Sequence, residues 1–232
     1  MSASPTICLA LLALFSCNFS AGAEEAISAF SRPNFIQILT DDQGWGDLRS
    51  FGHPFIESPH IDRLAEEGVK FTACYSSSAV CSPSRSSILT GRTPYRNGVY
   101  RWVPQGHFCH LPNSEVTLPQ LLQKAGYQTA HFGKWHLSHY SEERIGESQE
   151  FENFAFGGNP DQPSMAGYGY DYWLATGNVA RPSHKNPLNF FRNGKPLGKQ
   201  RGFSAQVVAR ELVQGLGDVR KADEPFFATV WF

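Results

Sequence analysis

Apolar positions in the first third of the chain follow the patterns of short buried strands and of helices. Residues 34–40 predict a short buried strand, and the polar, glycine-containing segment 41–46 predicts the loop that leaves it. Residues 58–68 predict a helix, because a serine N-cap and a first-turn proline precede apolar residues at helical spacing and a glycine closes the segment. Residues 69–75 predict a second strand.

The same alternation continues to the end of the sequence. Residues 117–126 predict a helix capped by threonine, and residues 127–132 predict the next strand. Residues 189–196 predict a hairpin that turns at an Asn-Gly pair, Ser204 opens another helix, and residues 225–232 form a strand-like apolar run. Alternating strands and helices indicate an α/β fold, with a mixed, largely parallel central sheet flanked by helices on both faces. Ligands are expected beyond the carboxyl ends of the strands.

Composition and charge narrow the class of protein. Of the 232 residues, 41% are hydrophobic and 13% are aromatic, which is enough for one sizeable core. The 20 basic and 21 acidic side chains leave a formal charge of -1, so no positive field is available to hold a nucleic acid or an anionic membrane surface. We therefore expect no nucleic-acid partner. We also expect no integral membrane segment, because the apolar run at residues 7–15 is too short to span a bilayer.

The N-terminus has the features of an export signal. Residues 7–15 form a nine-residue apolar run, and an Ala-Gly-Ala site ends at Ala23. We expect residues 1–23 to be a signal peptide, cleaved after Ala23, and the protein to be secreted or periplasmic. A lipid anchor on Cys17 is an alternative, since residues 14–17 distantly resemble a lipoprotein cleavage box.

The cysteines suggest one thiol with a separate purpose. Cys8 and Cys17 lie in or beside the expected leader, which leaves Cys74, Cys81 and Cys109 in the body of the chain. In an oxidising compartment, three cysteines fit one disulfide plus one cysteine with another role. Arithmetic alone makes Cys74 and Cys109 the candidate pair.

Two segments carry candidate chemistry. Asp41 and Asp42 are adjacent carboxylates at a strand end, a pair that suits a hard cation but that also occurs in ordinary turns. The second segment runs from Cys81 to Gly91 and reads Cys-Ser-Pro-Ser-Arg-Ser-Ser-Ile-Leu-Thr-Gly. Taken alone, it predicts a capped helix start that contains an incidental thiol.

This second segment resembles the maturation and active-site motif of the type I, formylglycine-dependent sulfatases. Residues 41–47, 58–65 and 133–137 are similar to the same family, and the likeness spans residues 33–232. It implies an alkaline-phosphatase-like fold and the N-terminal part of a sulfatase catalytic domain. Because members of the family are longer, with further active-site groups beyond the point that corresponds to residue 232, we expect the 232-residue chain to be truncated and, made alone, inactive and poorly folded.

The resemblance also implies a nucleophile and a metal site. A maturation enzyme is expected to oxidise Cys81 to formylglycine, an aldehyde that hydrates to a diol. In the family, one diol oxygen attacks sulfur and the other expels sulfate. Asp41, Asp42 and the converted Cys81 are implied as ligands of one divalent cation, usually Ca²⁺.

Three further residues receive roles from the family. Arg85 is expected to bind the diol and the neighbouring carboxylates, Lys134 a sulfate oxygen, and His136 the diol, as a partner in its deprotonation. Read singly, Arg85 and Lys134 could be surface cations and His136 a core imidazole. His107 and His110 form a weak candidate metal pair, and ordinary loop histidines explain them better.

The expected reaction is hydrolysis of sulfate monoesters on a sulfated small molecule or glycan. Two alternatives remain open: a phosphoester or phosphonate hydrolase of the same superfamily, and a non-catalytic protein that binds sulfated glycans. The loops at residues 100–111 and 157–184 are expected to set substrate specificity.

Overall fold

The computed structural model describes residues 32–103, 109–138, 140, 162–219 and 224–232. The chain divides into two units, Met1–Asn34 and Phe35–Phe232, and the fold below is that of the second. The expected leader, its cysteines and His107 lie outside the described residues. In the described part, no helix has the length and apolar character needed to cross a membrane.

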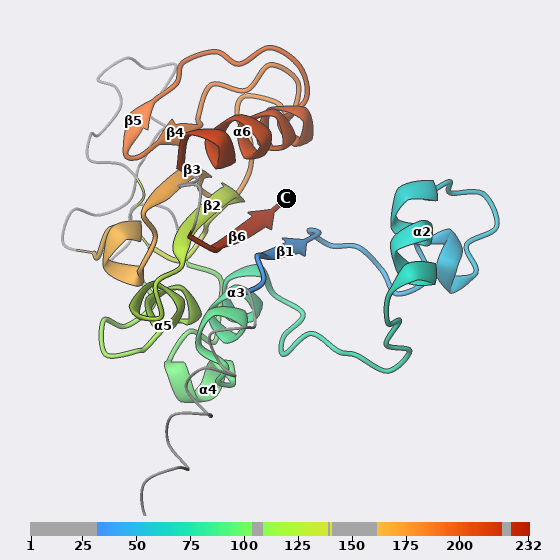
Figure 1. Ribbon diagram of the computed structural model, residues 1–232, viewed down its shortest axis with the longest axis horizontal. Helices are drawn as coiled ribbons and strands as arrows, with labels where there is room; N and C mark the ends of the chain where they lie inside the picture. The colour runs from blue at the N-terminus through green and yellow to red at the C-terminus, as the bar shows by residue number, and fades with distance from the viewer. Residues whose placement is uncertain (1–31, 104–108, 139, 141–161, 220–223) are drawn as a thin grey trace, which may run out of the picture. The chain divides into compact units, whose positions relative to one another are not determined.

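A six-stranded mixed sheet forms the centre of this unit, in the order β1-β6-β2-β3-β4-β5 (Figure 1). Four neighbouring strands are parallel and the last two are antiparallel, so the expected α/β fold with a largely parallel sheet is confirmed. The parallel strands are β1 (Phe35–Leu39), β6 (Phe226–Trp231), β2 (Gln128–Lys134) and β3 (Tyr172–Thr176), and the antiparallel hairpin consists of β4 (Phe191–Arg192) and β5 (Lys195–Pro196).

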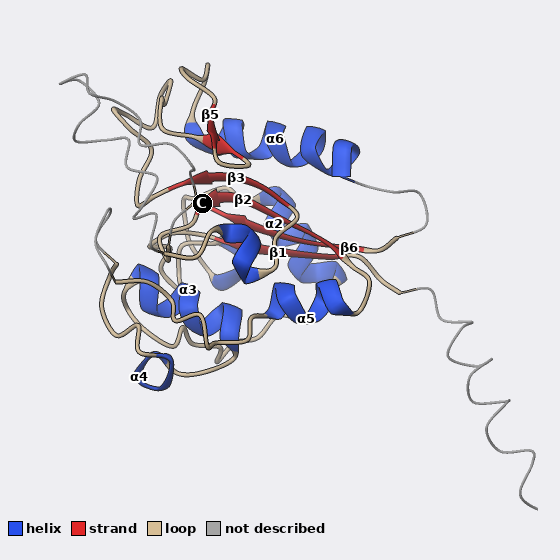
Figure 2. Ribbon diagram, turned by 90° about the vertical axis from the view of Figure 1, so that its left-hand side faces the viewer, coloured by secondary structure: helices blue, strands red, loops and turns tan. Residues whose placement is uncertain are grey.

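Helices cover both faces of the sheet (Figure 2). On one face lies α6 (Ser204–Val219), which buries Val207 and Val208 against the apolar side chains of β2 and β6. On the other lie α3 (Cys81–Thr90) and α5 (Leu118–Lys124), above a core that includes Leu89 and Trp231. The remaining helical elements are α2 (Pro59–Glu67), α4 (Pro94–Asn97), η1 (Arg49–Phe51) and η2 (Met165–Tyr168).

Local sequence signals explain several element boundaries. Thr117 caps α5 in a capping box with Gln120, as its position predicts. Asn193 and Gly194 both have positive φ, 46° and 82°, which is the geometry that a tight hairpin turn requires. Gly133 has a φ of +112°, and a Cβ there would lie 1.9 Å from the Trp231 carbonyl oxygen, so only glycine fits between β2 and β6.

The structure corrects two predictions about strands. Residues 69–75 form no strand; Val69 is 80% exposed and the segment pairs with no described strand, so its apolar pattern has no sheet to join. The first strand, β1, exists but is not buried, because it is an edge strand of the described sheet and Ile38 is 61% exposed. Strand β3 was not predicted from the sequence.

The predicted Cys74–Cys109 disulfide is also wrong for the described structure. Cys74 is a free, exposed thiol. Cys109 is half-buried, packs against the core that includes Leu89 and Trp231, and its carbonyl accepts a hydrogen bond from Gln162. The two cysteines therefore lie in different surroundings.

Strand register brings the carboxyl ends of the parallel strands to one edge of the sheet. Trp231 of β6 lies opposite Leu39 of β1 on one side and Gly133 of β2 on the other. Lys134 in turn lies opposite Thr176 of β3. The segments that leave β1, β2 and β3 consequently meet at this edge, where an α/β sheet places its ligands.

Candidate active site

Three potential metal ligands converge at the carboxyl edge of the sheet. Asp41 and Asp42 follow β1, and Cys81 is the first residue of α3. One carboxylate oxygen of each aspartate and the Cys81 Sγ all lie within 4.8 Å of one another. Asp42 has a φ of 53°, in the left-handed region, which aspartate adopts more readily than most residues with a side chain.

Arg85 connects this cluster to the sheet. Its side chain is 1% exposed and donates hydrogen bonds to the Asp41 Oδ1 at 3.1 Å, to the Lys134 carbonyl at 2.9 Å and to the Phe232 carbonyl at 3.2 Å. The guanidinium also lies over the ring of Trp231, at 5.1 Å from its centroid. One side chain of α3 thus contacts the ends of β1, β2 and β6.

Lys134 supplies the second cation of the cluster. It ends β2, is 5% exposed, and its Nζ donates to the Asp41 Oδ2 at 2.8 Å. Partial burial acts to raise the pKa of Asp41, but the hydrogen bond and charge of Lys134, together with those of Arg85, outweigh it and lower that pKa below its usual value of 3.8. Asp41 is therefore ionised at neutral pH.

His136 follows Lys134 and adopts an unusual backbone conformation, with a φ of 59°. Its imidazole is buried, and neither ring nitrogen makes a hydrogen bond of standard geometry within the described part of the chain. Burial, and then the charges of Lys134 and Arg85, lower its pKa to about 3. The imidazole is consequently neutral over the physiological range.

Ser82 fixes this backbone against α3, a contact that the sequence did not suggest. Its hydroxyl donates to the His136 carbonyl at 2.7 Å and accepts from the Val103 amide at 2.9 Å. The first turn of α3 and the segment after β2 are thereby joined.

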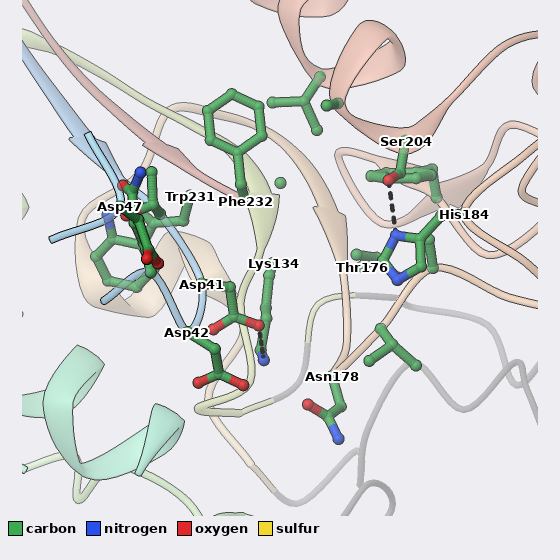
Figure 3. A pocket seen from close by; sticks show the side chains of 18 of the residues that line it. Asp41, Asp42, Asp47, Lys134, Thr176, Asn178, His184, Ser204, Trp231 and Phe232 are labelled. Atoms are coloured by element: carbon green, nitrogen blue, oxygen red, sulfur yellow. Dashed lines mark hydrogen bonds and ion pairs between the residues drawn. The ribbon is translucent and has the colours of Figure 1, made fainter. Parts of the chain in front are cut away.

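A cavity of about 620 Å³ opens beside Asp41, Asp42 and Lys134 (Figure 3). Its far wall contains Thr176 at the end of β3 and, beyond it, Asn178. The expected specificity loop at 157–184 therefore contributes to the cavity through its described residues. Their individual positions could not be read from the sequence, because β3, which places them, was missed. The full lining set is Thr40, Asp41, Asp42, Gln43, Asp47, Ile56, Gly133, Lys134, Thr176, Asn178, Val179, Ala180, His184, Phe190, Ser204, Ala205, Val208, Trp231 and Phe232.

The structure therefore gathers five of the six residues singled out in the sequence. Asp41, Asp42, Cys81, Arg85 and Lys134 form one cluster. The sixth, His136, lies on the segment that leaves Lys134, but its ring makes no described hydrogen bond to the other five.

Residues 33–232 match the family described as Sulfatase, which is most of the chain. The chain belongs to the sulfatase family. The cluster just described lies in three of the segments that resemble the family's motifs in the sequence, at residues 41–47, 81–91 and 133–137.

Curated members of the family are similar to the chain over about half its length. The N-acetylgalactosamine-6-sulfatase of Rattus norvegicus is 48% identical over 122 residues, which cover 49% of this chain and 23% of that protein. Arylsulfatase G of Homo sapiens is 45% identical over 109 residues, which cover 47% of this chain and 21% of that protein. The matched part thus spans about a quarter of the length of these relatives.

Solved structures support the fold. The structure of BT4656 in complex with its substrate D-glucosamine-2-N,6-O-disulfate has a TM-score of 0.62 and 28% sequence identity. The match covers 86% of this chain and 34% of the BT4656 chain. The structure of Ps i-CgsB has a TM-score of 0.70 at 23% sequence identity, and the match covers 87% of this chain and 45% of the Ps i-CgsB chain. The alkaline-phosphatase-like sulfatase fold expected from the resemblance is thereby confirmed.

Proposed function

We propose that the protein hydrolyses sulfate monoesters by means of a formylglycine made from Cys81 and a calcium ion. The observation that carries this proposal is the cluster of Asp41, Asp42 and Cys81 donor atoms within 4.8 Å of one another. A family motif alone would not require these three side chains to meet. Two cationic side chains, Arg85 and Lys134, border the same point.

The donor set suits a hard divalent cation. Asp41 and Asp42 supply carboxylate oxygens, and an oxygen at position 81 after conversion would add a third ligand of the same kind. Calcium takes about six to eight oxygens, so substrate, water or further groups would complete its shell. When bound, the ion would stabilise negative charge that develops at the sulfate group.

Charge balance supports an anionic substrate. The carboxylates of Asp41 and Asp42 offset the cationic groups of Arg85 and Lys134, so these four side chains together carry no net charge. A divalent cation would leave the site positive. A sulfate monoester anion would then be attracted into the mouth of the cavity.

The residue at position 81 would supply the nucleophile. Cys81 lies half-buried at the first turn of α3, where it borders the carboxylate pair. Hydrated formylglycine provides two hydroxyl groups on one carbon, one for attack and one for release of sulfate. A thiol or a serine hydroxyl at this position lacks that second hydroxyl.

Three further side chains would act around this centre. Lys134 and Arg85 would hold charged groups in position, and His136 would exchange a proton. The Lys134 ammonium has three donors and uses one on Asp41, so another can bind a sulfate oxygen. Arg85 fixes the Asp41 carboxylate from the opposite oxygen. His136 is neutral, so its ring nitrogen can accept a proton from the nucleophile once an anion nearby raises its low pKa.

The relatives favour a sulfated carbohydrate as substrate. N-acetylgalactosamine-6-sulfatases and a structure with bound D-glucosamine-2-N,6-O-disulfate are both among the similar proteins. We further propose that the protein acts outside the cytoplasm, because of the apolar run and Ala-Gly-Ala site at its N-terminus.

Mass spectrometry of the tryptic peptide 71–85 tests the nucleophile. The intact natural protein would be co-produced with a formylglycine-generating enzyme. We expect an aldehyde at Cys81, while Cys74 in the same peptide stays a thiol and serves as the internal control. Release of sulfate and of phosphate from matched aryl esters would be measured in parallel.

Two variants complete the test. Cys81→Ala is expected to abolish sulfate release, whereas Cys74→Ala, at an exposed cysteine, should retain it. If Cys81 stays unmodified and the protein still binds sulfated glycans, the sulfatase proposal is refuted and the alternative of a non-catalytic glycan-binding protein is favoured. Turnover of the phosphate ester alone would replace sulfatase activity with phosphoester hydrolysis.

A further inference from the structure

The cavity beside the proposed reaction centre has two chemically different sides (Figure 3). Asp41, Asp42 and Lys134 form the charged side. Across the cavity, Thr176 and His184 belong to a side that is polar but carries no carboxylate, lysine or arginine among its described lining residues. A bound ester must place its sulfate at the charged side, so its alcohol portion faces the other.

Thr176 is the clearest sign that this second side is built for a ligand. The residue is 4% exposed, lines the cavity, and its Oγ1 has no hydrogen-bond partner within the described residues. Its own carbonyl is already used by the Trp135 amide at 2.9 Å. A buried hydroxyl without a partner costs about 1–3 kcal/mol, and a substrate hydroxyl or amide at this point would remove that cost.

His184, which lines the same cavity, is held in a defined orientation. Its Nδ1 lies 2.9 Å from the Ser204 Oγ at the start of α6. The second ring nitrogen, Nε2, has no partner in the described part of the chain and can bind a ligand. Asn178, also in the lining, adds an amide that makes no described side-chain hydrogen bond. Hydroxyl, imidazole and amide together can donate to and accept from sugar hydroxyls.

The charges around the cavity restrict what the alcohol portion can carry. Among the described lining residues, Lys134 is the only lysine or arginine, and the proposed reaction already assigns its remaining donors to the sulfate that is cleaved. Asp47 adds a further carboxylate to the lining. A second sulfate on the same ring would find no countercharge there, and it would lose its water of hydration on entry.

Size and apolar content agree with one sugar ring. The volume of about 620 Å³ lies within the range of about 300–1,000 Å³ that is common for small-molecule sites. Phe190 and Val208 line the cavity and offer apolar surface to the C–H faces of a ring.

We propose that this cavity is the alcohol-side subsite, and that it selects a sugar ring with one sulfate and otherwise uncharged hydroxyl or amide substituents. Thr176 and His184 are its specificity-determining residues. The inference rests on the proposed function, because it assigns the substrate class of the same site.

The test compares three esters with the intact natural protein, co-produced with a formylglycine-generating enzyme. N-acetylglucosamine 6-sulfate and D-glucosamine-2-N,6-O-disulfate differ only in an acetyl or a sulfate on the amine, and 4-nitrophenyl sulfate serves as the reference. We expect kcat/KM for the monosulfated sugar to exceed that for the disulfated sugar at least about tenfold. Equal values, or a preference for the disulfated sugar, would overturn the inference.

Variants assign the selectivity to the named residues. In Thr176→Val and His184→Ala, the ratio of kcat/KM for the monosulfated sugar over the aryl ester should fall about 3- to 10-fold, the effect of one lost hydrogen bond. Thr176→Ser, which keeps the hydroxyl, should restore the ratio. Thr93→Val, at an exposed threonine without a described side-chain hydrogen bond, should leave the ratio unchanged.

The outcomes separate the two proposals. Hydrolysis of the aryl ester without an effect of Thr176→Val and His184→Ala on the ratio refutes the subsite and leaves the sulfatase proposal intact. No sulfate release from any of the three esters refutes the proposed function itself.

Discussion

Replacement of Arg85 by lysine should destabilise the protein strongly although the charge is kept. Arg85 is 1% exposed and donates to three separate acceptors, the Asp41 carboxylate and the carbonyls of Lys134 and Phe232. An ammonium group is more compact than the planar guanidinium and cannot reach all three at once. At least two acceptors would lose their partner.

The magnitude follows from these contacts. Each buried acceptor without a partner costs about 1–3 kcal/mol, so two of them lower the free energy of unfolding by about 2–6 kcal/mol. The stacking of the guanidinium over Trp231 would be lost as well. Full truncation in Arg85→Ala should cost more, because the Asp41 carboxylate then keeps only Lys134.

Urea denaturation of the intact natural protein, followed by tryptophan fluorescence, measures this change. Arg63→Lys is the matched control, since Arg63 is 71% exposed and pairs with Glu67 only across one turn of α2. An exposed pair of this kind contributes about 0–1 kcal/mol, and most of that survives in lysine. If Arg85→Lys and Arg63→Lys lower the free energy of unfolding equally, Arg85 does not stabilise the fold by linking α3 to the ends of β1, β2 and β6.

Three further outcomes are expected from the same structure. Gly133→Ala should lower the free energy of unfolding by about 3 kcal/mol or more, because a Cβ at a φ of +112° would lie 1.9 Å from a backbone oxygen of β6. Gly46→Ala is the control: beyond its chain neighbours, a Cβ there would meet no atom of the described residues within 4 Å, so the same urea assay should show a change of less than about 0.5 kcal/mol. Burial, and then the charge of Arg85, lower the pKa of His131 from 6.5 to about 3. As the pH falls below 6.5, this imidazole is therefore protonated in the unfolded chain but stays neutral in the folded chain. Through this group alone, the free energy of unfolding should therefore fall by about 2 kcal/mol between about pH 7 and about pH 5. Urea titrations at the two pH values measure this loss. His131→Asn should remove it, and the control His60→Asn should not. Asp42→Asn should weaken calcium binding about tenfold or more in isothermal titration calorimetry; unchanged affinity would place the ion elsewhere.

Much of the fold could be predicted because local signals agree with the final structure. The capping box at Thr117, the Asn193-Gly194 turn and the apolar run at the end of the chain each fix one element without help from distant residues. β3 was missed although Tyr-Trp-Leu-Ala-Thr is a run of strand formers. Its place between β2 and β4 depends on pairing with segments far away in the sequence, which no local pattern encodes.

The two wrong predictions about strands have a common physical cause. Periodicity reports which side chains favour an apolar surrounding, not whether a neighbouring strand is present to provide it. In the described sheet, β1 has β6 on one side only, and residues 69–75 have no strand beside them. Their exposed apolar side chains follow directly from this lack of neighbours.

The site could be predicted as a set of residues but not as a geometry, and the reason lies in Arg85. The motif places Cys81 and Arg85 four residues apart, so both lie on neighbouring turns of one helix. The guanidinium brings the helix to the carboxylates, because it donates to Asp41 beyond β1, to Lys134 at the end of β2 and to Phe232 just after β6. The relative position of Cys81 and Asp41 is therefore set by contacts that span 44 to 147 residues of sequence. A substitution that loosens Arg85 should shift the thiol away from the carboxylates before it disturbs any strand, because the strands keep their own backbone ladders.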